Sequence, residues 1–296
     1  MSWRVTLHCT RAEAEALPDS EDLFPFSDSP PVIVADEPDP HAPDDWRIHA
    51  YFADQPTTQE RVLLRRLAAH GDPELEHLGE DDWVTMSQAG LEPIRAGRFF
   101  IHTSTHRDQR PADAVPFEID AGLAFGTGQH ATTAGCLEAL DRLEASGKRF
   151  TNIADIGTGT GLLAFAALKL WPAARAIATD IDPISIDVSG DNARINAVPI
   201  GHAPGELLLA VADGMDHPML ATRAPFDLLI ANILAGPLIE LAPSFAESVA
   251  PGASVVLAGL LDTQADVVIA AYEAQGMTVT ERGDGEWCVL ALDAAK

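Results

Sequence analysis

The chain has 296 residues, 47% of them hydrophobic, and its 45 acidic and 19 basic residues give a formal net charge of -26. Length and composition predict a soluble globular protein with one large domain and a smaller one. The charge argues against a broad phosphate-binding surface, which would need clustered Lys and Arg, and it favours a basic protein partner. Acidity that only keeps the protein soluble explains the charge equally well.

Neither the first residues of the chain nor its cysteines indicate export. The first eight residues lack the basic and continuously apolar regions of a signal peptide, and no stretch approaches about 18 uninterrupted apolar residues. Cys9, Cys136 and Cys288 are scattered, which fits a reducing compartment. The 10 histidines show no metal-ligand spacing. We expect a cytoplasmic monomer without a metal or a membrane segment.

Residues 1–103 predict a small α+β domain. Residues 3–9 and 46–53 are typical of strands, and residues 58–70 have apolar positions at helical spacing. Between them, residues 18–45 are rich in Pro, Asp, Glu and Ser, so part of this segment is expected to be irregular loop. Residues 104–116 are expected to form a linker to a second domain at 117–296.

The second domain shows a regular alternation of strands and helices. Strands are expected at 152–156, 176–181, 206–212, 227–231, 254–258, 277–281 and 287–292. Helices are expected at 133–144, 161–170, 183–196, 236–249 and 263–275. Strands separated by helices imply right-handed parallel crossovers, hence an α/β fold with a Rossmann-like, doubly wound, seven-stranded sheet. Only residues 282–286 join the last two strands, so these must form a terminal antiparallel hairpin.

Three closely spaced glycines, Gly157, Gly159 and Gly161, follow the first strand of this domain. At the carboxyl edge of an α/β sheet, backbone without Cβ atoms lets a ligand lie against the chain. The third glycine comes one residue earlier than in the dinucleotide pattern G-x-G-x-x-G, which argues against an NAD-dependent oxidoreductase. A tight strand-to-helix connection without a ligand is the structural alternative.

Two aspartates follow the next strand. The carboxylate of Asp180 can accept hydrogen bonds from both hydroxyls of a ribose, a role common to the Rossmann-type cofactor classes. Asp182 precedes Pro183, where a helix N-cap is expected. Capping is an alternative for both, and we assign ribose binding to Asp180 and capping to Asp182.

Several motifs together resemble one family. They are DAGLAFGTGQHATT at 120–133, DIGTGTG at 155–161, DIDP at 180–183, ANILAGPL at 231–238 and EWC at 286–288. In this order they resemble the ribosomal protein L11 methyltransferase family (PrmA type) of class I S-adenosylmethionine-dependent methyltransferases. The resemblance covers residues 117–294. It implies a two-domain enzyme whose small amino-terminal domain recognises a large-subunit ribosomal protein, and which methylates lysine side chains and the terminal amine of that protein.

The resemblance also implies roles for individual residues. Thr133, Gly157, Gly159 and Asp180 would bind S-adenosylmethionine, with Asp180 on the ribose. Asn232 would lie at the methyl-transfer end, against the cofactor, and would orient the amine without acting as a general base.

The sequence departs from the family pattern in places. Gln129 and Ala131 stand where the family often has Thr and Pro, and Ile-Leu follows Asn232 where amino-methylating enzymes have Pro-Pro. Asp213 stands where many methyltransferases contact adenine, and a role in a turn is nearly as well supported.

Other functions remain open. The chain could methylate a small-molecule amine or RNA, or it could be a cofactor-binding scaffold without catalysis. The acidic amino-terminal domain favours a protein substrate over RNA, and the intact Asn232 counts against a scaffold. No direct nucleic-acid binding is expected.

Overall fold

The computed structural model describes residues 2–15, 23–24, 31–36, 46–52, 54–67, 70–78, 93–119 and 129–296. The chain divides into two units, Met1–Ser87 and Gln88–Lys296. Most of the segment 18–45 and the motif residues 120–128 lie outside the described residues, so the expectations made for them stay expectations.

The first unit is built around a four-stranded antiparallel sheet in the order β2-β3-β1-β4. Its elements are β1 (Ser2–Cys9), α1 (Arg11–Glu15), β2 (Val32–Asp36), β3 (Trp46–Phe52), α3 (Thr58–Leu64) and β4 (His70–Leu78). The expected strands 3–9 and 46–53 are confirmed, whereas the expected helix 58–70 ends at Leu64. The core of this unit includes Val5, Leu7, Ile48 and Phe52.

Two strands of this unit were not predicted. β2 lies inside the Pro-rich and acidic segment 18–45, part of which was expected to be irregular loop. β4 contains Gly71 and Pro73, which argue against a strand in most contexts. Because β4 is an edge strand of the sheet, a proline there breaks no ladder on the outer side.

The second unit contains the predicted seven-stranded sheet, in the order β10-β9-β8-β11-β12-β14-β13. Its strands are β8 (Asn152–Ile156), β9 (Arg175–Asp180), β10 (Leu207–Val211), β11 (Phe226–Asn232), β12 (Val249–Leu261), β13 (Thr278–Arg282) and β14 (Trp287–Asp293). β8 to β12 pair in parallel, and β13 and β14 form the expected antiparallel hairpin. β14 inserts between β12 and β13 and runs antiparallel to both. The predicted fold class is therefore confirmed.

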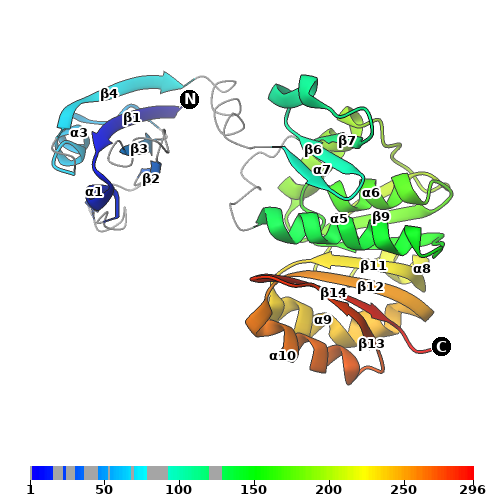
Figure 1. Cartoon of the computed structure of the whole chain (residues 1–296). Helices are drawn as coiled ribbons and strands as arrows, with labels where there is room; N and C mark the ends of the chain where they lie inside the picture. The colour runs from blue at the N-terminus through cyan, green and yellow to red at the C-terminus, as the bar shows by residue number, and fades with distance from the viewer. Residues whose placement is uncertain are drawn as a thin grey trace. The chain divides into compact units, whose positions relative to one another are not determined.

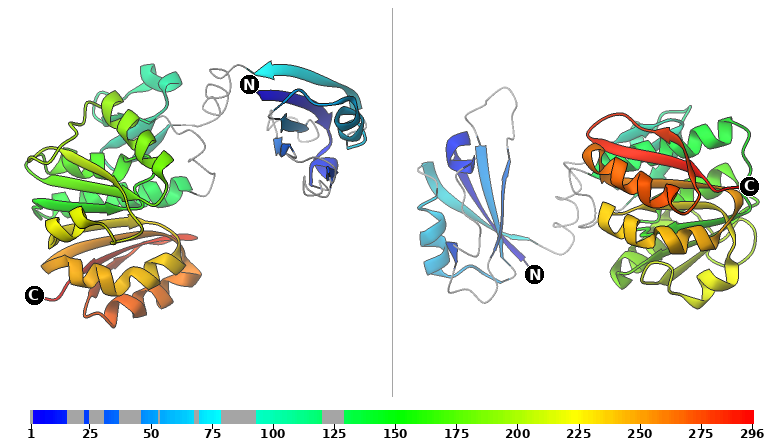
Figure 2. Two further views of the ribbon diagram at one scale, coloured as in Figure 1. Left: turned by 180° about the vertical axis from the view of Figure 1, so that it is seen from behind. Right: turned by 90° about the horizontal axis from the view of Figure 1, so that it is seen from below.

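Helices cover both faces of this sheet (Figure 1, Figure 2). One face carries α5 (Gln129–Ala145), α6 (Leu162–Leu170) and α7 (Pro183–Ile195), and the other carries α9 (Ala235–Ser248) and α10 (Asp262–Glu273). The short helix α8 (Pro218–Arg223) was not predicted. Double coverage explains why β8 is buried at every position, including its polar residues Asn152 and Asp155.

A small three-stranded sheet precedes these elements within the second unit. It consists of β5 (Ile94–Ala96), β6 (Phe99–His102) and β7 (Val115–Glu118), with the 3-10 helix η1 (Ser104–Gln109) between β6 and β7. Phe99, Ile101 and Phe117 belong to the same core cluster as α5 and α6. The residues expected to end the first domain and to form a linker at 104–116 thus lie in the second unit.

Candidate active site

The glycine turn lies between β8 and α6 at the carboxyl edge of the sheet. Gly157, Gly159 and Gly161 all have left-handed φ angles, of 73°, 57° and 85°. A Cβ on Gly157 would overlap Cγ2 of Ile233, and one on Gly161 would overlap the ring of Phe165. A Cβ on Gly159 would meet nothing within 4 Å. Packing therefore requires glycine at two positions, while the open side of Gly159 is where a ligand can approach the backbone.

The side chain of Asp155 holds the glycine turn in place by hydrogen bonds. Its Oδ2 accepts hydrogen bonds from Oγ1 of Thr158 (2.7 Å) and from the backbone N–H of Ala164 (3.2 Å), so one carboxyl joins the turn to the first turn of α6. Oδ1 is buried without a hydrogen-bond partner. Burial raises the pKa of Asp155 to about 7, against the lowering effect of its two hydrogen bonds.

Two side chains of helix α7 also donate hydrogen bonds to the glycine turn. Oγ of Ser189 donates to the carbonyl of Gly159 (2.8 Å), and Nδ2 of Asn192 donates to the carbonyl of Thr160 (3.1 Å). Both side chains are fully buried. They lie three residues apart on one face of the helix, and this spacing of polar residues was the only signal that the sequence offered for their role.

Asp180 and Asp182 have separate roles. Oδ2 of Asp180 accepts from the N–H of Gly159 (2.9 Å), and its Oδ1 accepts from the N–H of Asp182 (3.0 Å). Asp182 is the N-cap of α7, because its Oδ1 accepts from the N–H of Ile184 (2.9 Å). The capping assignment of Asp182 is confirmed. Asp180 is hydrogen-bonded to the glycine turn and half-buried, and its oxygens keep lone pairs that can accept from further donors.

The sequence motifs did not predict the exposed apolar surface beside Asp180. Ile181 is 66% exposed and Val211, which pairs with Asp180 in the sheet register, is 45% exposed. Asp213 follows on the same edge in a tight turn, in which the N–H of Asp216 donates to the carbonyl of Asp213 (3.0 Å). The turn role of Asp213 is thus present, and its carboxylate is exposed.

Thr133 and Asn232 come together from residues far apart in the sequence. Nδ2 of Asn232, the last residue of β11, donates a long hydrogen bond to Oγ1 of Thr133 (3.4 Å). α5 begins at Gln129 instead of at 133, so Thr133 lies inside the helix and is not its N-cap. Asn232 does not cap α9 either, since the N-cap of that helix is Leu234. Oδ1 of Asn232 makes no hydrogen bond to the described part of the chain.

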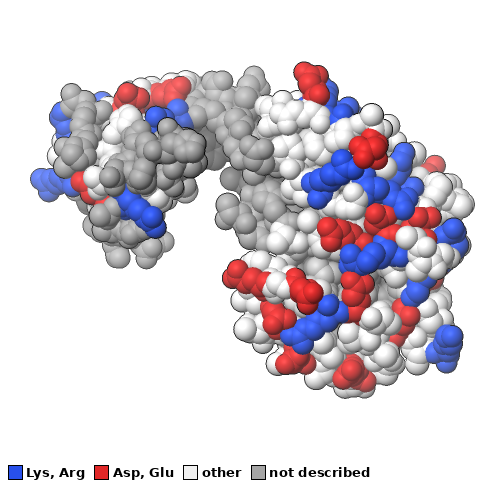
Figure 3. Space-filling model, in the orientation of Figure 1, with Lys and Arg blue, Asp and Glu red and all other residues white. Residues whose placement is uncertain are grey.

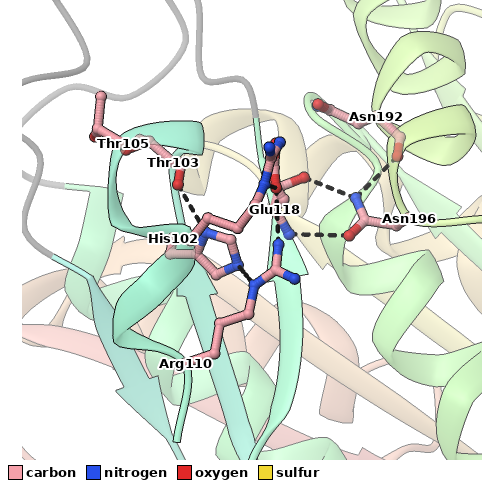
Figure 4. A network of polar contacts seen from close by, with 8 residues as sticks. His102, Thr103, Thr105, Arg110, Glu118, Asn192 and Asn196 are labelled. Carbon is pink, nitrogen blue, oxygen red and sulfur yellow. Dashed lines mark hydrogen bonds and ion pairs between the residues drawn. The ribbon is translucent and has the colours of Figure 1, made fainter.

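A partly buried polar network lies on the small sheet (Figure 4). Nε of Arg110 donates to Nε2 of the buried His102 (2.8 Å), so Nε2 is unprotonated, and Nδ1–H donates to the carbonyl of Thr103 (2.7 Å). Burial lowers the pKa of His102, in agreement with a neutral ring. Arg107 and Arg110 also bind the carboxylate of Glu118, and the hydrogen bond from Arg107 lowers the pKa of Glu118.

This network reaches the glycine turn through α7. Asn196 pairs with both backbone groups of Glu118, accepting from its N–H (2.9 Å) and donating to its carbonyl (2.7 Å). Nδ2 of Asn196 also donates to the carbonyl of Asn192, whose side chain holds Thr160. The end of β7 is therefore linked to α7, as Figure 4 shows, and through Asn192 to the glycine turn.

Comparison with known proteins decides the family. A sequence model of the family described as "Ribosomal protein L11 methyltransferase (PrmA)" matches residues 3–295. The chain belongs to the ribosomal protein L11 methyltransferase family. A ribosomal protein L11 methyltransferase of Brucella suis is 49% identical over 221 residues, covering 74% of this chain and 75% of the relative. One from Sinorhizobium fredii is 46% identical over 236 residues, covering 78% and 79%.

A solved structure supports the same assignment. The ribosomal protein L11 methylase of Lactobacillus delbrueckii subsp. bulgaricus matches with a TM-score of 0.58 and 27% identity, covering 70% of this chain and 99% of that one. The large unit is therefore a class I methyltransferase fold, and its cofactor is S-adenosylmethionine. The open side of Gly159, the carboxylate of Asp180 and the exposed Ile181 fit a nucleoside with a polar sugar and an apolar base.

The described residues contain no group of three or more His, Cys, Asp or Glu side chains that could hold a metal ion. Across the same residues, no helix is both long and apolar enough to cross a membrane. All three cysteines are buried.

Proposed function

We propose that this methyltransferase transfers methyl groups to lysine side chains and to the terminal amine of ribosomal protein L11. The observation that carries the proposal is the placement of Asn232. It ends β11, the strand next to β8, so its amide lies beside the glycine turn, and Thr133 holds its Nδ2 while Oδ1 stays available as an acceptor. An amide oxygen in this position can accept an N–H bond from an incoming amine.

The reaction needs orientation more than acid–base chemistry. S-adenosylmethionine, when bound, supplies a methyl group that is already activated by the positive charge on sulfur. The protein has to hold the amine in line with that methyl group, and such positioning can contribute about 7 to 11 kcal/mol of the barrier. Gly159 and Asp180 would hold the cofactor, and Asn232 would direct the lone pair of the amine.

A lysine must reach the site in its neutral form. Its free side chain has a pKa of about 10.4, and only the uncharged amine carries the lone pair that attacks the methyl group. Transfer out of water and next to a cationic sulfur would lower that pKa. Asn232 is uncharged at any pH, so it orients the amine and leaves the proton to solvent.

The charge distribution supports a basic protein substrate over RNA. On the face shown in Figure 3, Lys and Arg side chains of the large unit are interspersed with Asp and Glu. Arg98 pairs with Asp141 and Glu144, and Arg142 pairs with Glu281. Such pairing leaves few basic side chains for a phosphate backbone. We assign substrate recognition to residues 1–103, and we expect a cytoplasmic monomer.

The test is a transfer assay with labelled S-adenosylmethionine. The protein is incubated with a ribosomal protein extract and with purified L11, and the labelled residues are identified by mass spectrometry. Label on lysine and terminal amines of L11 is expected. Label found only in RNA or in small molecules would overturn the proposal, and cofactor binding without any transfer would indicate a scaffold.

Replacement of Asn232 tests the site itself. Asn232→Ala should lower the transfer rate by about 100-fold, because a misplaced amine loses about 2.7 kcal/mol of the positioning contribution. The variant should still bind S-adenosylhomocysteine, measured by calorimetry, which shows that the fold is intact. Near-normal turnover by this variant would refute the role of Asn232.

A further inference from the structure

Ile233, the residue after Asn232, lies between two glycines that both have left-handed φ angles. On one side is Gly157, the first glycine of the cofactor turn, with φ 73°. On the other side is Gly259, in β12, with φ 85°. Gly157 lies in the turn after β8 and Gly259 lies in β12, so the contacts of Ile233 connect the glycine turn with β12.

The contact with Gly259 is made by backbone atoms. The N–H of Ile233 donates to the carbonyl of Ala258 (3.1 Å), where the pairing of β12 with β14 shifts its register between Leu257 and Leu260. A Cβ on Gly259 would overlap the carbonyl oxygen of Ile233 and lie 2.7 Å from its C and 2.9 Å from its N. A peptide unit cannot rotate away as a flexible side chain can. Any larger residue at 259 must therefore displace the backbone of Ile233: its carbonyl group first, and with it the N–H of the peptide that joins it to Asn232.

The contact with Gly157 is made by the side chain. Cγ2 of Ile233 occupies the volume that a Cβ on Gly157 would need. A branched side chain has few χ1 rotamers, so its Cγ2 holds a defined place. The distance between the glycine turn and the backbone of Ile233 is thus set by this one methyl group.

The same geometry explains how this chain does without Pro-Pro after Asn232. A proline at 233 would lack the N–H that bonds to Ala258, and it would fix the backbone through its ring. Here the backbone is fixed by that hydrogen bond and by packing between two glycines. The rigidity comes from the neighbouring strands.

We propose that Ile233 is a positioning residue for methyl transfer, seated on Gly259, which sets the distance of the Asn232 amide from the cofactor turn. The inference rests on the proposed function, because it gives Asn232 the amine. A shift of the 232–233 peptide then displaces the amine from the methyl group. It leaves Asp180 and the open face of Gly159, on the far side of the turn, in place.

The experiment compares two Gly→Ala variants. Gly259→Ala introduces the overlap with the Ile233 backbone. Gly276→Ala is the matched control, because Gly276 has φ 81° and a Cβ there would meet nothing within 4 Å. Both put alanine in the left-handed region, so both melting temperatures should fall, and that of Gly259→Ala should fall further because of the backbone overlap. Single-turnover transfer to L11 at saturating cofactor, and the Kd for S-adenosylhomocysteine, are measured for each.

Gly259→Ala should lose on the order of 10- to 100-fold in rate, since a displacement of about 1 Å at a reacting centre has such an effect. Its Kd should stay within about twofold of the wild type, since cofactor contacts are kept. Gly276→Ala should transfer at the wild-type rate. Equal rates for the two variants would overturn the inference, and so would a loss of cofactor affinity that matches the loss of rate.

Ile233 itself gives a second test that does not depend on Gly259→Ala folding. Ile233→Ala removes Cγ2 and should lower the rate, whereas Ile233→Val keeps both Cγ atoms and should retain most of it. Equal rates for these variants would contradict the role of the methyl group. If the wild type transfers to no amine, the proposed function fails and the inference with it; if the wild type is active and the variants match it, only the inference fails.

Discussion

The carboxyl of Asp155 makes the stability of the large unit depend on pH. It is 1% exposed, and burial raises its pKa to about 7, whereas the unfolded chain has the ordinary value of about 3.9. Between these two values the folded protein holds a proton that the unfolded chain has lost. The contribution of this group to the free energy of unfolding is therefore full below a pH of about 3.9, and it decreases as the pH rises toward 7.

Asp155→Asn removes this titration and keeps the shape of the side chain. The amide oxygen can accept from Thr158 and Ala164 as Oδ2 does, and the new amino group replaces Oδ1, which has no partner. Each pH unit between the two pKa values changes the free energy of unfolding by about 1.4 kcal/mol. From pH 5.5 to 8.5 the variant should gain about 2 kcal/mol over the wild type, most of it below pH 7.

The measurement is urea unfolding of both proteins at several pH values in this range, which lies above the sequence pI of about 4.5. Because the chain has two units, the transition that S-adenosylhomocysteine shifts identifies the large unit. The difference between the proteins cancels other titrating groups, including His102. A difference that does not change with pH would show that Asp155 is ionised in the folded protein and would refute the reasoning.

Two further substitutions test the cofactor end and the link to Asn232, and a third tests the support of the turn. Asp180→Ala should weaken S-adenosylmethionine binding by about 1 to 3 kcal/mol in calorimetry, whereas the control Asp182→Ala should cost only helix-cap stability and leave binding intact. Thr133→Val should lower the transfer rate by about fivefold, as expected for loss of one hydrogen bond to Asn232, and Thr133→Ser should restore part of it. Asn196→Ala should lower the free energy of unfolding by about 1 to 3 kcal/mol in urea titration, since both backbone groups of Glu118 lose a partner; no change would mean that water replaces them.

The sequence predicts the large sheet well, because its strands are short apolar runs bounded by turn residues. β8 has the predicted bounds, and β11 extends one residue beyond the prediction at each end. The small sheet of β5 to β7 was missed, since strands of three or four residues carry little periodicity. β12 begins five residues earlier than expected, across Pro251 and Gly252, which resemble a turn.

The site divides in the same way. Local motifs single out Gly157, Asp180 and Asn232, and their roles in binding and transfer stay predictions. Such motifs do not single out Ser189 and Gly259, because their roles are contacts with segments far away in the sequence. A buried serine in a helix has the same local pattern as one on a solvent face. Only the folded chain shows that it holds the carbonyl of Gly159.

In the proposed function the described site would hold an amine and a nucleoside, but it contains little that would select one protein. Thr133 and Asn232 offer a hydroxyl and an amide, which any unhindered primary amine can use. Binding energy that selects L11 must therefore come from surfaces outside this site, and remote binding energy is also what would hold a flexible lysine in line. We expect the first unit, residues 1–87 of the segment 1–103, to supply that binding, because the seven-stranded unit already supplies the chemistry. Deletion of the first unit should then lower the rate of transfer to L11 far more than it lowers the affinity for the cofactor.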